Sequence, residues 1–267
     1  MKFFLAPMQG LTGYTVRNAF HHHFDYIDKY YTPFIPAAKR MNAKIKRDID
    51  PVNNDGITLI PQAMSIVADE VIDLHRQLVP YGYDEINVNL GCPSGTVVSK
   101  KRGSGILAYP DMLDSFLDEL YTKADFPVSI KTRVGFNDDE LWPRLIEIYS
   151  KYPISELTVH PRVQKDFYKN TPRMDDFALA MQKINPDKTI LCYNGDITNA
   201  NSFKALTDRF PDIDEIMIGR GLFANPALIA ELNGISMDKA ELRERLKNWH
   251  DEILSGYLSI FSGEKDA

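Results

Sequence analysis

The stretch DEINVNLGCP, residues 84–93, decides the fold. Its isoleucine and valine alternate with two asparagines, and this period of two predicts a short β-strand over residues 85–89. Gly91 ends the strand, and the proline that closes the stretch prevents an immediate helix. Cys92 is therefore expected at a turn just beyond the carboxyl end of a strand.

Two interpretations of Cys92 follow. A thiol held at a strand end by glycine and proline, beside the carboxamide of Asn89, is placed to reach a substrate. Free cysteine is also among the most buried residue types, so an inert thiol in the core explains the same pattern. Asn87 and Asn89 are two positions apart and are expected on the same side of the strand. This stretch alone leaves both interpretations open.

Length and composition describe an ordinary globular protein. The 267 residues suffice for one large α/β barrel or two small domains, and hydrophobic residues make up 44% and charged residues 25%. No apolar run approaches the length of a membrane span, so no membrane association is expected. Cys92 and Cys192, the two cysteines, form no disulfide framework in a chain of this size, which indicates a reducing, cytoplasmic environment.

Eight strand-like runs recur along the chain with amphipathic stretches between them. Several runs are almost continuously apolar, as parallel strands covered on both faces should be. Eight β/α units in this length predict an α/β fold, a (β/α)8 TIM barrel over residues 1–235, because that fold typically takes about 250 residues. A doubly wound sheet is the alternative. The predicted strands cover residues 3–7, 26–31, 57–62, 85–89, 128–132, 156–160, 189–193 and 215–218.

The pattern changes after the eighth unit. Residues 238–261 carry apolar side chains spaced mostly by three or four among many charges, which predicts a long amphipathic helix. We therefore expect residues 236–267 to form a short helical appendage, the beginning of a C-terminal helical domain.

Polar residues occupy nearly every predicted strand end, where a (β/α)8 barrel gathers its chemistry. Lys131 is open to three interpretations: a Schiff-base amine, a point charge for an anion, or a solvated strand-end residue. His160 is either a core histidine or a ligand contact. No metal site is expected, because no cysteine or acid pair completes a ligand spacing around the three consecutive histidines at residues 21–23.

Glycines after the last two strands predict a phosphate site. Asn194, Gly195 and Asp196 follow the seventh strand, and Gly219 and Arg220 follow the eighth. Glycine lets backbone N–H groups close on an anion, and barrels commonly bind phosphate at this position. A phosphate-bearing cofactor or substrate is therefore expected here.

Basic residues gather in four segments that follow predicted strands, although the net charge is −6. If the strands are parallel, these segments share one end of the molecule and form a basic face suited to a nucleic acid. Scattered solvated lysines are the alternative. The residues are Lys39, Arg40, Lys44, Lys46, Arg47, Lys100, Lys101, Arg102, Arg133, Arg162, Lys165, Lys169 and Arg173.

Together these residues resemble the tRNA-dihydrouridine synthase family of FMN-dependent (β/α)8 enzymes. The resemblance runs from Pro7 to about Pro226, and the Asn-x-Gly-Cys-Pro loop separates this family from most other flavin barrels. The motifs are Ala6-Pro7-Met8-x-Gly10-x-Thr12, Asn89-x-Gly91-Cys92-Pro93 with Val97, Lys100 and Gly103, Lys131-x-Arg133, Thr158-Val159-His160-x-Arg162, Asn194-Gly195-Asp196 and Gly219-Arg220-Gly221.

The resemblance implies reduction of a tRNA uridine to 5,6-dihydrouridine, with FMN restored by NADPH or NADH and no stable protein partner. Reduced FMN would deliver hydride to C6 of the uracil, and Cys92 would protonate C5 as general acid. The cofactor-binding residues it implies are Pro7, Met8, Gln62, Lys131, His160, Asn194, Gly195, Asp196, Gly219 and Arg220. The substrate-binding residues it implies are Asn89, Lys100, Arg133 and Arg162.

Family members usually continue into a longer C-terminal helical domain, so residues 236–267 are expected to be a truncated or a reduced version of it. Three other functions fit the same residues. They are an FMN barrel acting on a free pyrimidine or another small enone, an RNA-binding protein without catalysis, and an aldolase with a Schiff base at Lys131.

Overall fold

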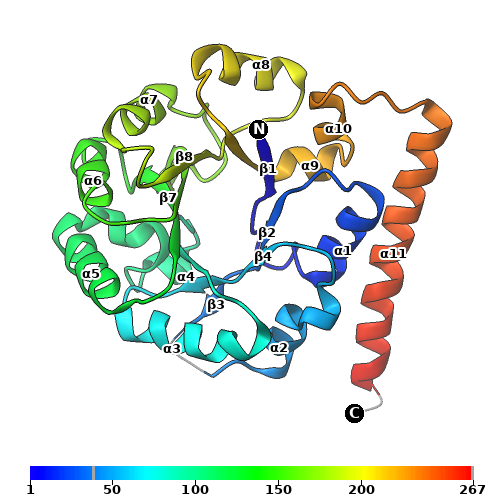
Figure 1. Cartoon of the computed structure of the whole chain (residues 1–267), viewed down its shortest axis with the longest axis horizontal. Coiled ribbons are helices and arrows are strands. Elements are labelled where there is room, and N and C mark those ends of the chain that lie inside the picture. Colours follow the sequence, from blue (N-terminus) through cyan, green and yellow to red (C-terminus); the bar gives the residue numbers. More distant parts are fainter. Residues whose placement is uncertain (38–39, 266–267) are drawn as a thin grey trace.

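A computed structural model describes residues 1–37 and 40–265, with side chains to residue 260. Lys39, one of the predicted basic residues, lies outside the described residues. Figure 1 shows a ring of strands surrounded by helices, with one long helix lying outside the ring. The predicted (β/α)8 TIM barrel is confirmed.

Ten strands within the described residues form one parallel sheet. Its order is β3-β5-β6-β7-β8-β9-β10-β1-β2-β4. β4 and β5 lie on either side of Pro61, so together they are one barrel strand that pairs with β2 on one side and β6 on the other and closes the ring. The strands are β1 Lys2–Leu5, β2 Lys29–Tyr31, β3 Ile35–Pro36, β4 Leu59–Ile60, β5 Gln62–Met64, β6 Ile86–Leu90, β7 Val128–Gly135, β8 Glu156–Val163, β9 Ile190–Tyr193 and β10 Glu215–Ile218.

All eight predicted strands are present, and two details differ. Pro61 has no N–H to give to a ladder, which explains why the third predicted strand is interrupted. The short β3, which pairs with β5, was not predicted, because two residues are too few to show a period.

Helices cover the outside of the ring, and those that pack on the strands, such as α3, α5 and α6, do so through a buried apolar stripe. The α-helices are α1 Tyr14–His23, α2 Ala43–Ile49, α3 Ala68–Leu78, α4 Gly95–Val98, α5 Pro110–Lys123, α6 Trp142–Tyr149, α7 Met174–Lys183, α8 Ala200–Arg209, α9 Arg220–Ala224, α10 Leu228–Leu232 and α11 Lys239–Lys265. The 3₁₀ turns are η1 Pro51–Asn53, η2 Val79–Tyr81, η3 Gly103–Ala108 and η4 Gln164–Asp166.

The core has two parts. The larger lies between the strands and the helices. The smaller lies inside the barrel and consists of Phe4, Ala6, Tyr31, Ile60, Cys192 and Met217. Because side chains fill the inside of the ring, its centre is a packed core, and open space is left at the ends of the strands.

Helix α11 confirms the long C-terminal helix and packs along α1 (Figure 1). The Trp249 and Phe20 rings meet edge to face with centroids 5.3 Å apart. A β-carbon at Gly256 would overlap the side chain of Thr15, so the two helices cross closely there. The division at residue 235 into two domains stays a prediction. No helix in the described part of the chain has the length and hydropathy needed to cross a lipid bilayer.

Candidate active site at the carboxyl ends of the strands

A cavity of about 480 Å³ opens at the carboxyl ends of the strands. This size falls within the range of small-molecule and cofactor sites. Its walls come from the segments that follow β1, β6, β8, β9 and β10 and from side chains on β5, β7 and β8. The lining residues are Ala6, Pro7, Met8, Gln9, Leu11, Phe34, Gln62, Asn89, Gly91, Cys92, Pro93, Ser94, Lys131, Arg133, His160, Phe167, Tyr168, Asn194, Gly195, Asp196, Gly219 and Arg220.

The loop that carries Cys92 is fixed from both sides. Asn89 Oδ1 accepts from the backbone N–H groups of Gly91 at 3.1 Å and Cys92 at 2.8 Å. The Cys92 carbonyl accepts from the Ser104 backbone N–H at 3.1 Å and hydroxyl at 2.9 Å. Gly103 has φ +55°, and a β-carbon there would lie 2.7 Å from that carbonyl oxygen. A larger residue at this position would displace the thiol.

A row of amides orients Asn89 itself. Asn89 Nδ2 donates to Gln62 Oε1 at 2.7 Å, and Gln62 Nε2 donates to Asn87 Oδ1 at 2.8 Å. Asn87 Nδ2 in turn donates to the Ser129 hydroxyl at 3.0 Å. Each hydrogen bond fixes whether the oxygen or the nitrogen of an amide faces the next side chain. The row therefore links the three adjacent strands β5, β6 and β7 as one rigid unit. Asn89 and Gln62 each keep one side-chain N–H outside these hydrogen bonds.

Cys92 is half-buried at the cavity wall and is a free thiol. Burial raises the pKa of this thiol, and the opposing effects of the Ser94 backbone N–H and of the cations Arg133 and Lys131 do not cancel it. A free cysteine ordinarily titrates near 8.5, so Cys92 is a neutral proton carrier at pH 7. The inert-core interpretation does not fit a cysteine that lines the cavity.

Lys131 lies on β7 with its ammonium group in the cavity wall. Nζ donates to Asn194 Oδ1 at 2.6 Å, and Asn194 Nδ2 donates to the Met217 carbonyl at 2.8 Å. Burial, reinforced by the charge of Arg133, lowers the pKa of Lys131 to about 7. The amine therefore changes its protonation state near neutral pH, and its hydrogen-bond partner, the Asn194 amide, is neutral.

Arg133 is 2% exposed and donates to three backbone carbonyls. They belong to Gly91 at 3.0 Å, Val163 at 2.9 Å and Phe167 at 2.7 Å. Burial lowers the pKa of Arg133 to about 10, so the guanidinium remains charged at neutral pH. It fastens the Cys92 loop to the segment after β8, and two of its five N–H donors remain outside these bonds.

His160 accepts from Arg162 at its Nε2 atom, 3.1 Å away. An arginine N–H can only donate, so the proton of the neutral imidazole sits on Nδ1. Burial, together with the charges of Arg133 and Lys131, lowers the pKa of His160 well below its usual range. The imidazole is neutral at pH 7.

Asp196 joins two arginines. Its carboxylate accepts from the buried Arg162 and from Arg220, whose Nη2 lies 2.6 Å from Oδ1. Burial opposes ionisation of Asp196, but the hydrogen bond and charge of Arg162 and the charge of Arg220 outweigh it and lower the pKa of the carboxyl. Asp196 thereby holds Arg220, half exposed, at the cavity wall.

The segment between β8 and α7 contributes two aromatic residues to the cavity that the sequence did not indicate, Phe167 and Tyr168. The Tyr168 ring lies 4.9 Å from the Arg220 guanidinium carbon and 5.6 Å from that of Arg133. Phe167 has φ +52°, a left-handed conformation that is uncommon for aromatic residues. A loop of this kind has no periodic pattern, and the one signal was two adjacent aromatics between charged residues.

Two predicted substrate residues do not line the cavity, although Arg162 donates to His160 and Asp196 in its wall. Among the described residues that line it, neither Lys100 nor Arg162 is present. Lys100 is exposed after α4, whereas Arg162 is 1% exposed and bonded to Asp196 and to the carbonyls of Lys169 and Asn170. The expected basic face is therefore corrected: Arg133 and Arg162 are buried and contribute no exposed charge, because carbonyls and a carboxylate hold their guanidinium groups.

The fold and the position of the cavity together define a structural class of protein. A closed parallel barrel with a thiol, a lysine and an arginine around a cavity at the carboxyl ends of its strands is a (β/α)8 barrel with the site position used by barrel enzymes. Residues 4–255 match the family model described as "Dihydrouridine synthase (Dus)". The chain belongs to the dihydrouridine synthase family.

Two curated relatives give the same family. The chain is 27% identical over 243 residues to "tRNA-dihydrouridine synthase B" of Pasteurella multocida (strain Pm70), covering 88% of this chain and 69% of the relative. It is 32% identical over 195 residues to a "Probable tRNA-dihydrouridine synthase" of Staphylococcus aureus (strain Mu50 / ATCC 700699), covering 71% of this chain and 56% of the relative. The matched segments thus span between about half and two-thirds of these relatives' lengths.

Solved structures bear on the fold. Morphinone reductase superposes with a TM-score of 0.59 at 11% identity, covering 90% of this chain and 88% of the other. The old yellow enzyme from Trypanosoma cruzi gives 0.58 at 8% identity, covering 88% and 89%. At these identities the likeness supports the barrel alone.

Proposed function

We propose that this protein reduces uridine in tRNA to 5,6-dihydrouridine, with FMN as cofactor, NADPH or NADH as reductant and Cys92 as general acid. The observation that carries the proposal is the neutral Cys92 thiol, fixed at the wall of a cofactor-sized cavity in a member of the dihydrouridine synthase family. Reduction of the isolated C=C bond of uracil needs a hydride donor and a proton donor, and the thiol supplies the second.

The residues around the cavity fit FMN. Gly219 leaves space that a β-carbon would fill, within 3.3 Å of Ala6 and 3.6 Å of the Met8 sulfur. Arg220 and the backbone around Gly195 and Gly219 would hold the phosphate. Pro7 and Met8 would contact the ring system, Gln62 and Lys131 would donate to its edge, and neutral His160 would help to position it. FMN bound there would supply the hydride.

The chain's own residues prepare the second half of the reaction. Asn89 and Ser104 hold the Cys92 backbone, so the thiol proton is presented from a fixed position. The proton goes to C5 of the uracil as hydride arrives at C6, leaving a thiolate that solvent reprotonates. The remaining N–H groups of Asn89 and Arg133 would orient the uracil. The Arg220 and Arg162 contacts make Asp196 a positioning residue for the phosphate site.

A single-turnover experiment tests the proposal. The purified protein is loaded with FMN, reduced anaerobically and mixed with unmodified tRNA, and the flavin absorbance is followed. Reoxidation by tRNA together with dihydrouridine in the product is the expected result. Bound flavin that tRNA leaves reduced, but that free uracil reoxidises, would instead assign the barrel to a free pyrimidine. Failure to bind FMN at all would overturn the proposal that FMN is the cofactor.

A further inference from the structure

A second cavity of about 520 Å³ lies beside the first. The two share Gln9 and Phe34, so they are adjacent and open at the same end of the barrel. The second is formed by the segment after β1, by β3, by α2 and by the last described turns of α11. Its lining residues are Gln9, Gly10, Gly13, Tyr14, Thr15, Pro33, Phe34, Ile35, Pro36, Asn42, Lys44, Ile45, Arg47, Asp48, Tyr257 and Ile260.

The walls of this cavity suit a flat ring. Tyr14, Phe34 and Tyr257 are half-buried aromatics that come from three separate segments, and two prolines lie beside them. Aromatic side chains that line an open cavity are the usual stacking surfaces for nucleobases, and they accept every base because each base has a flat face.

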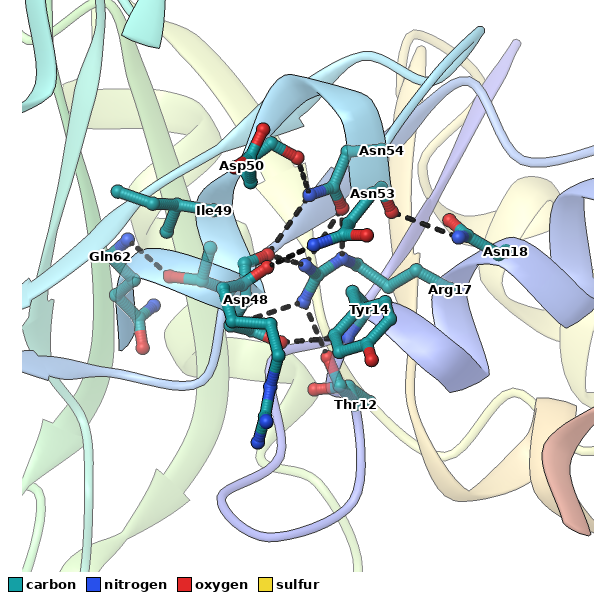
Figure 2. Close-up of polar contacts among 12 residues, drawn as sticks. Thr12, Tyr14, Arg17, Asn18, Asp48, Ile49, Asp50, Asn53, Asn54 and Gln62 are labelled. Atoms are coloured by element: carbon teal, nitrogen blue, oxygen red, sulfur yellow. Dashed lines mark hydrogen bonds and ion pairs between the residues drawn. The ribbon is translucent and has the colours of Figure 1, made fainter. Parts of the chain in front are cut away.

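A network of hydrogen bonds, drawn in Figure 2, lies behind Tyr14 and Asp48 in the cavity wall. Arg17 is fully buried and directs its N–H groups at the Thr12 carbonyl, at Asp48 and at Asn54 Oδ1. The Asp48 carboxylate also accepts from the Tyr14 backbone N–H at 2.7 Å. This network fixes the start of α1, and therefore Tyr14, against the end of α2.

The same network neutralises the negative charge of Asp48 in the cavity wall. Asp48 is the one carboxylate among the described lining residues, and Arg17 neutralises it at 3.2 Å. Arginine stays protonated in proteins, so the pair has no net charge. Lys44 then adds a positive charge at the cavity rim. Lys44 is exposed and has no ion-pair partner in the part of the chain that the structure describes.

We infer that the second cavity holds the base of a nucleotide next to the reacting uridine in the RNA, with a backbone phosphate beside Lys44. Three observations carry this inference: aromatic walls, an exposed lysine at the rim and a shared boundary with the candidate active site. It rests on the proposed function. A uridine can enter the first cavity only if it leaves its stack, and its neighbour then loses a stacking partner, which Tyr14, Phe34 or Tyr257 replaces.

The first experiment pairs protein variants with altered RNA. Wild-type protein and Tyr257→Ala are titrated with tRNA that is abasic immediately 5′ or immediately 3′ of the uridine that becomes dihydrouridine. At one of the two positions the abasic change should weaken wild-type binding about five- to tenfold, in line with the loss of one stacked base. For Tyr257→Ala the same change should cost nothing further, and Tyr257→Phe should behave like wild type.

The phosphate contact is tested separately. Lys44→Ala should weaken tRNA binding several-fold and reduce the slope of log Kd against log salt by about one, because one phosphate contact is lost. Lys188→Ala is the control, since Lys188 is exposed in the loop between α7 and β9, is not among the residues that line either cavity, and should leave the slope unchanged. Melting curves for all variants verify that α11 stays docked.

The outcomes separate the two proposals. If tRNA reoxidises the reduced flavin but abasic RNA weakens wild type and Tyr257→Ala equally at both positions, the nucleotide site is overturned and the proposed function stands. If Tyr257→Ala and Lys44→Ala raise the KM for NADPH in the reductive half-reaction and leave tRNA affinity unchanged, the cavity binds the dinucleotide instead and the inference is wrong. If tRNA never reoxidises the flavin, the proposed function fails first.

Discussion

The two ends of the barrel treat buried charge in opposite ways. At the amino end, Glu156 accepts from Lys29 at 2.7 Å, from Tyr31 at 2.8 Å and from Thr158 at 2.8 Å. Burial opposes the charge on Lys29, yet Glu156 outweighs it and raises the pKa of the amine. At the carboxyl end, Lys131 faces a neutral amide, and burial lowers its pKa to about 7.

The contrast between Lys29 and Lys131 distinguishes an end of the barrel that contributes to stability from an end that is arranged to bind a ligand. The amino end pairs its half-buried lysine with a carboxylate, although burial and the charge of Glu156 raise the pKa of the neighbouring Glu85 and Glu215. The carboxyl end holds Lys131, Arg133 and His160 around open space, where cations depress one another's pKa values. A cluster that is unfavourable in the free protein becomes favourable when an anion occupies it, which is the behaviour expected of a binding site.

The two cysteines give the largest expected effect. Cys92→Ala should retain FMN and NADPH oxidation but lower dihydrouridine formation by about 10²–10⁴-fold, because the proton donor is gone. Cys192 is buried inside the barrel, where burial raises its thiol pKa, and Cys192→Ala should leave turnover per folded molecule close to wild type. Product analysis of tRNA by mass spectrometry measures both. Wild-type turnover in Cys92→Ala would remove the general-acid role.

The next effect is on stability. Lys29→Met should lower the free energy of unfolding by about 3 kcal/mol, because Glu156 is left buried with neutral partners alone. Lys131→Met should lower the free energy of unfolding little or should raise it, since it removes a buried cation that has no anionic partner among the described residues. Urea unfolding of both variants measures the contrast. Equal losses would show that the two ends of the barrel are not energetically different.

Arg220 should have an intermediate effect on cofactor retention. Arg220→Ala removes a charge-assisted contact and should raise the Kd for FMN about tenfold to a hundredfold. Arg209→Ala, at the exposed end of α8, serves as the matched control. Fluorescence titration of apoprotein with FMN measures both, and unchanged affinity for Arg220→Ala would move the phosphate site elsewhere.

The smallest effect is a pH dependence of FMN binding. Above pH 7 the Lys131 amine is mostly neutral in the free protein, so binding that uses the ammonium form must take up a proton. FMN affinity should therefore fall by up to about tenfold per pH unit as the pH rises above 7, and it should level off below 7. Lys131→Met should flatten the profile. A flat profile in wild type would show that FMN does not draw on this charge.

The features that could be predicted from the sequence are those that follow from hydrophobic periodicity and strand order. Alternating and continuous apolar runs located the eight barrel strands, and the barrel then brought thirteen predicted residues to one cavity. Sequence could not show which cations would be exposed. Arg133 and Arg162 are buried because backbone carbonyls of a later loop accept from them, and such contacts depend on tertiary structure.

The loop between β8 and α7 was beyond prediction for a related reason. Its two residues with positive φ, Phe167 and Asn170, are not glycines, so the sequence lacks the usual glycine signal for this turn. Asp166 also fixes the turn by accepting from the Val163 backbone N–H and from Asn170. The second cavity was missed because α11 and α2 are about two hundred residues apart and meet through α1.

The way Arg133 and Arg162 hold that loop has a consequence for variation and for engineering. Both arginines hydrogen-bond this loop through its backbone carbonyls, those of Phe167, Lys169 and Asn170, and Tyr168 adds a ring contact to Arg133 at 5.6 Å. The loop can thus exchange the residues at 167 to 169 and keep its path across the cavity. The side chains of this loop can therefore be changed, in evolution or by design, to alter which substrate is preferred. The two arginines and the Cys92 loop would stay unchanged.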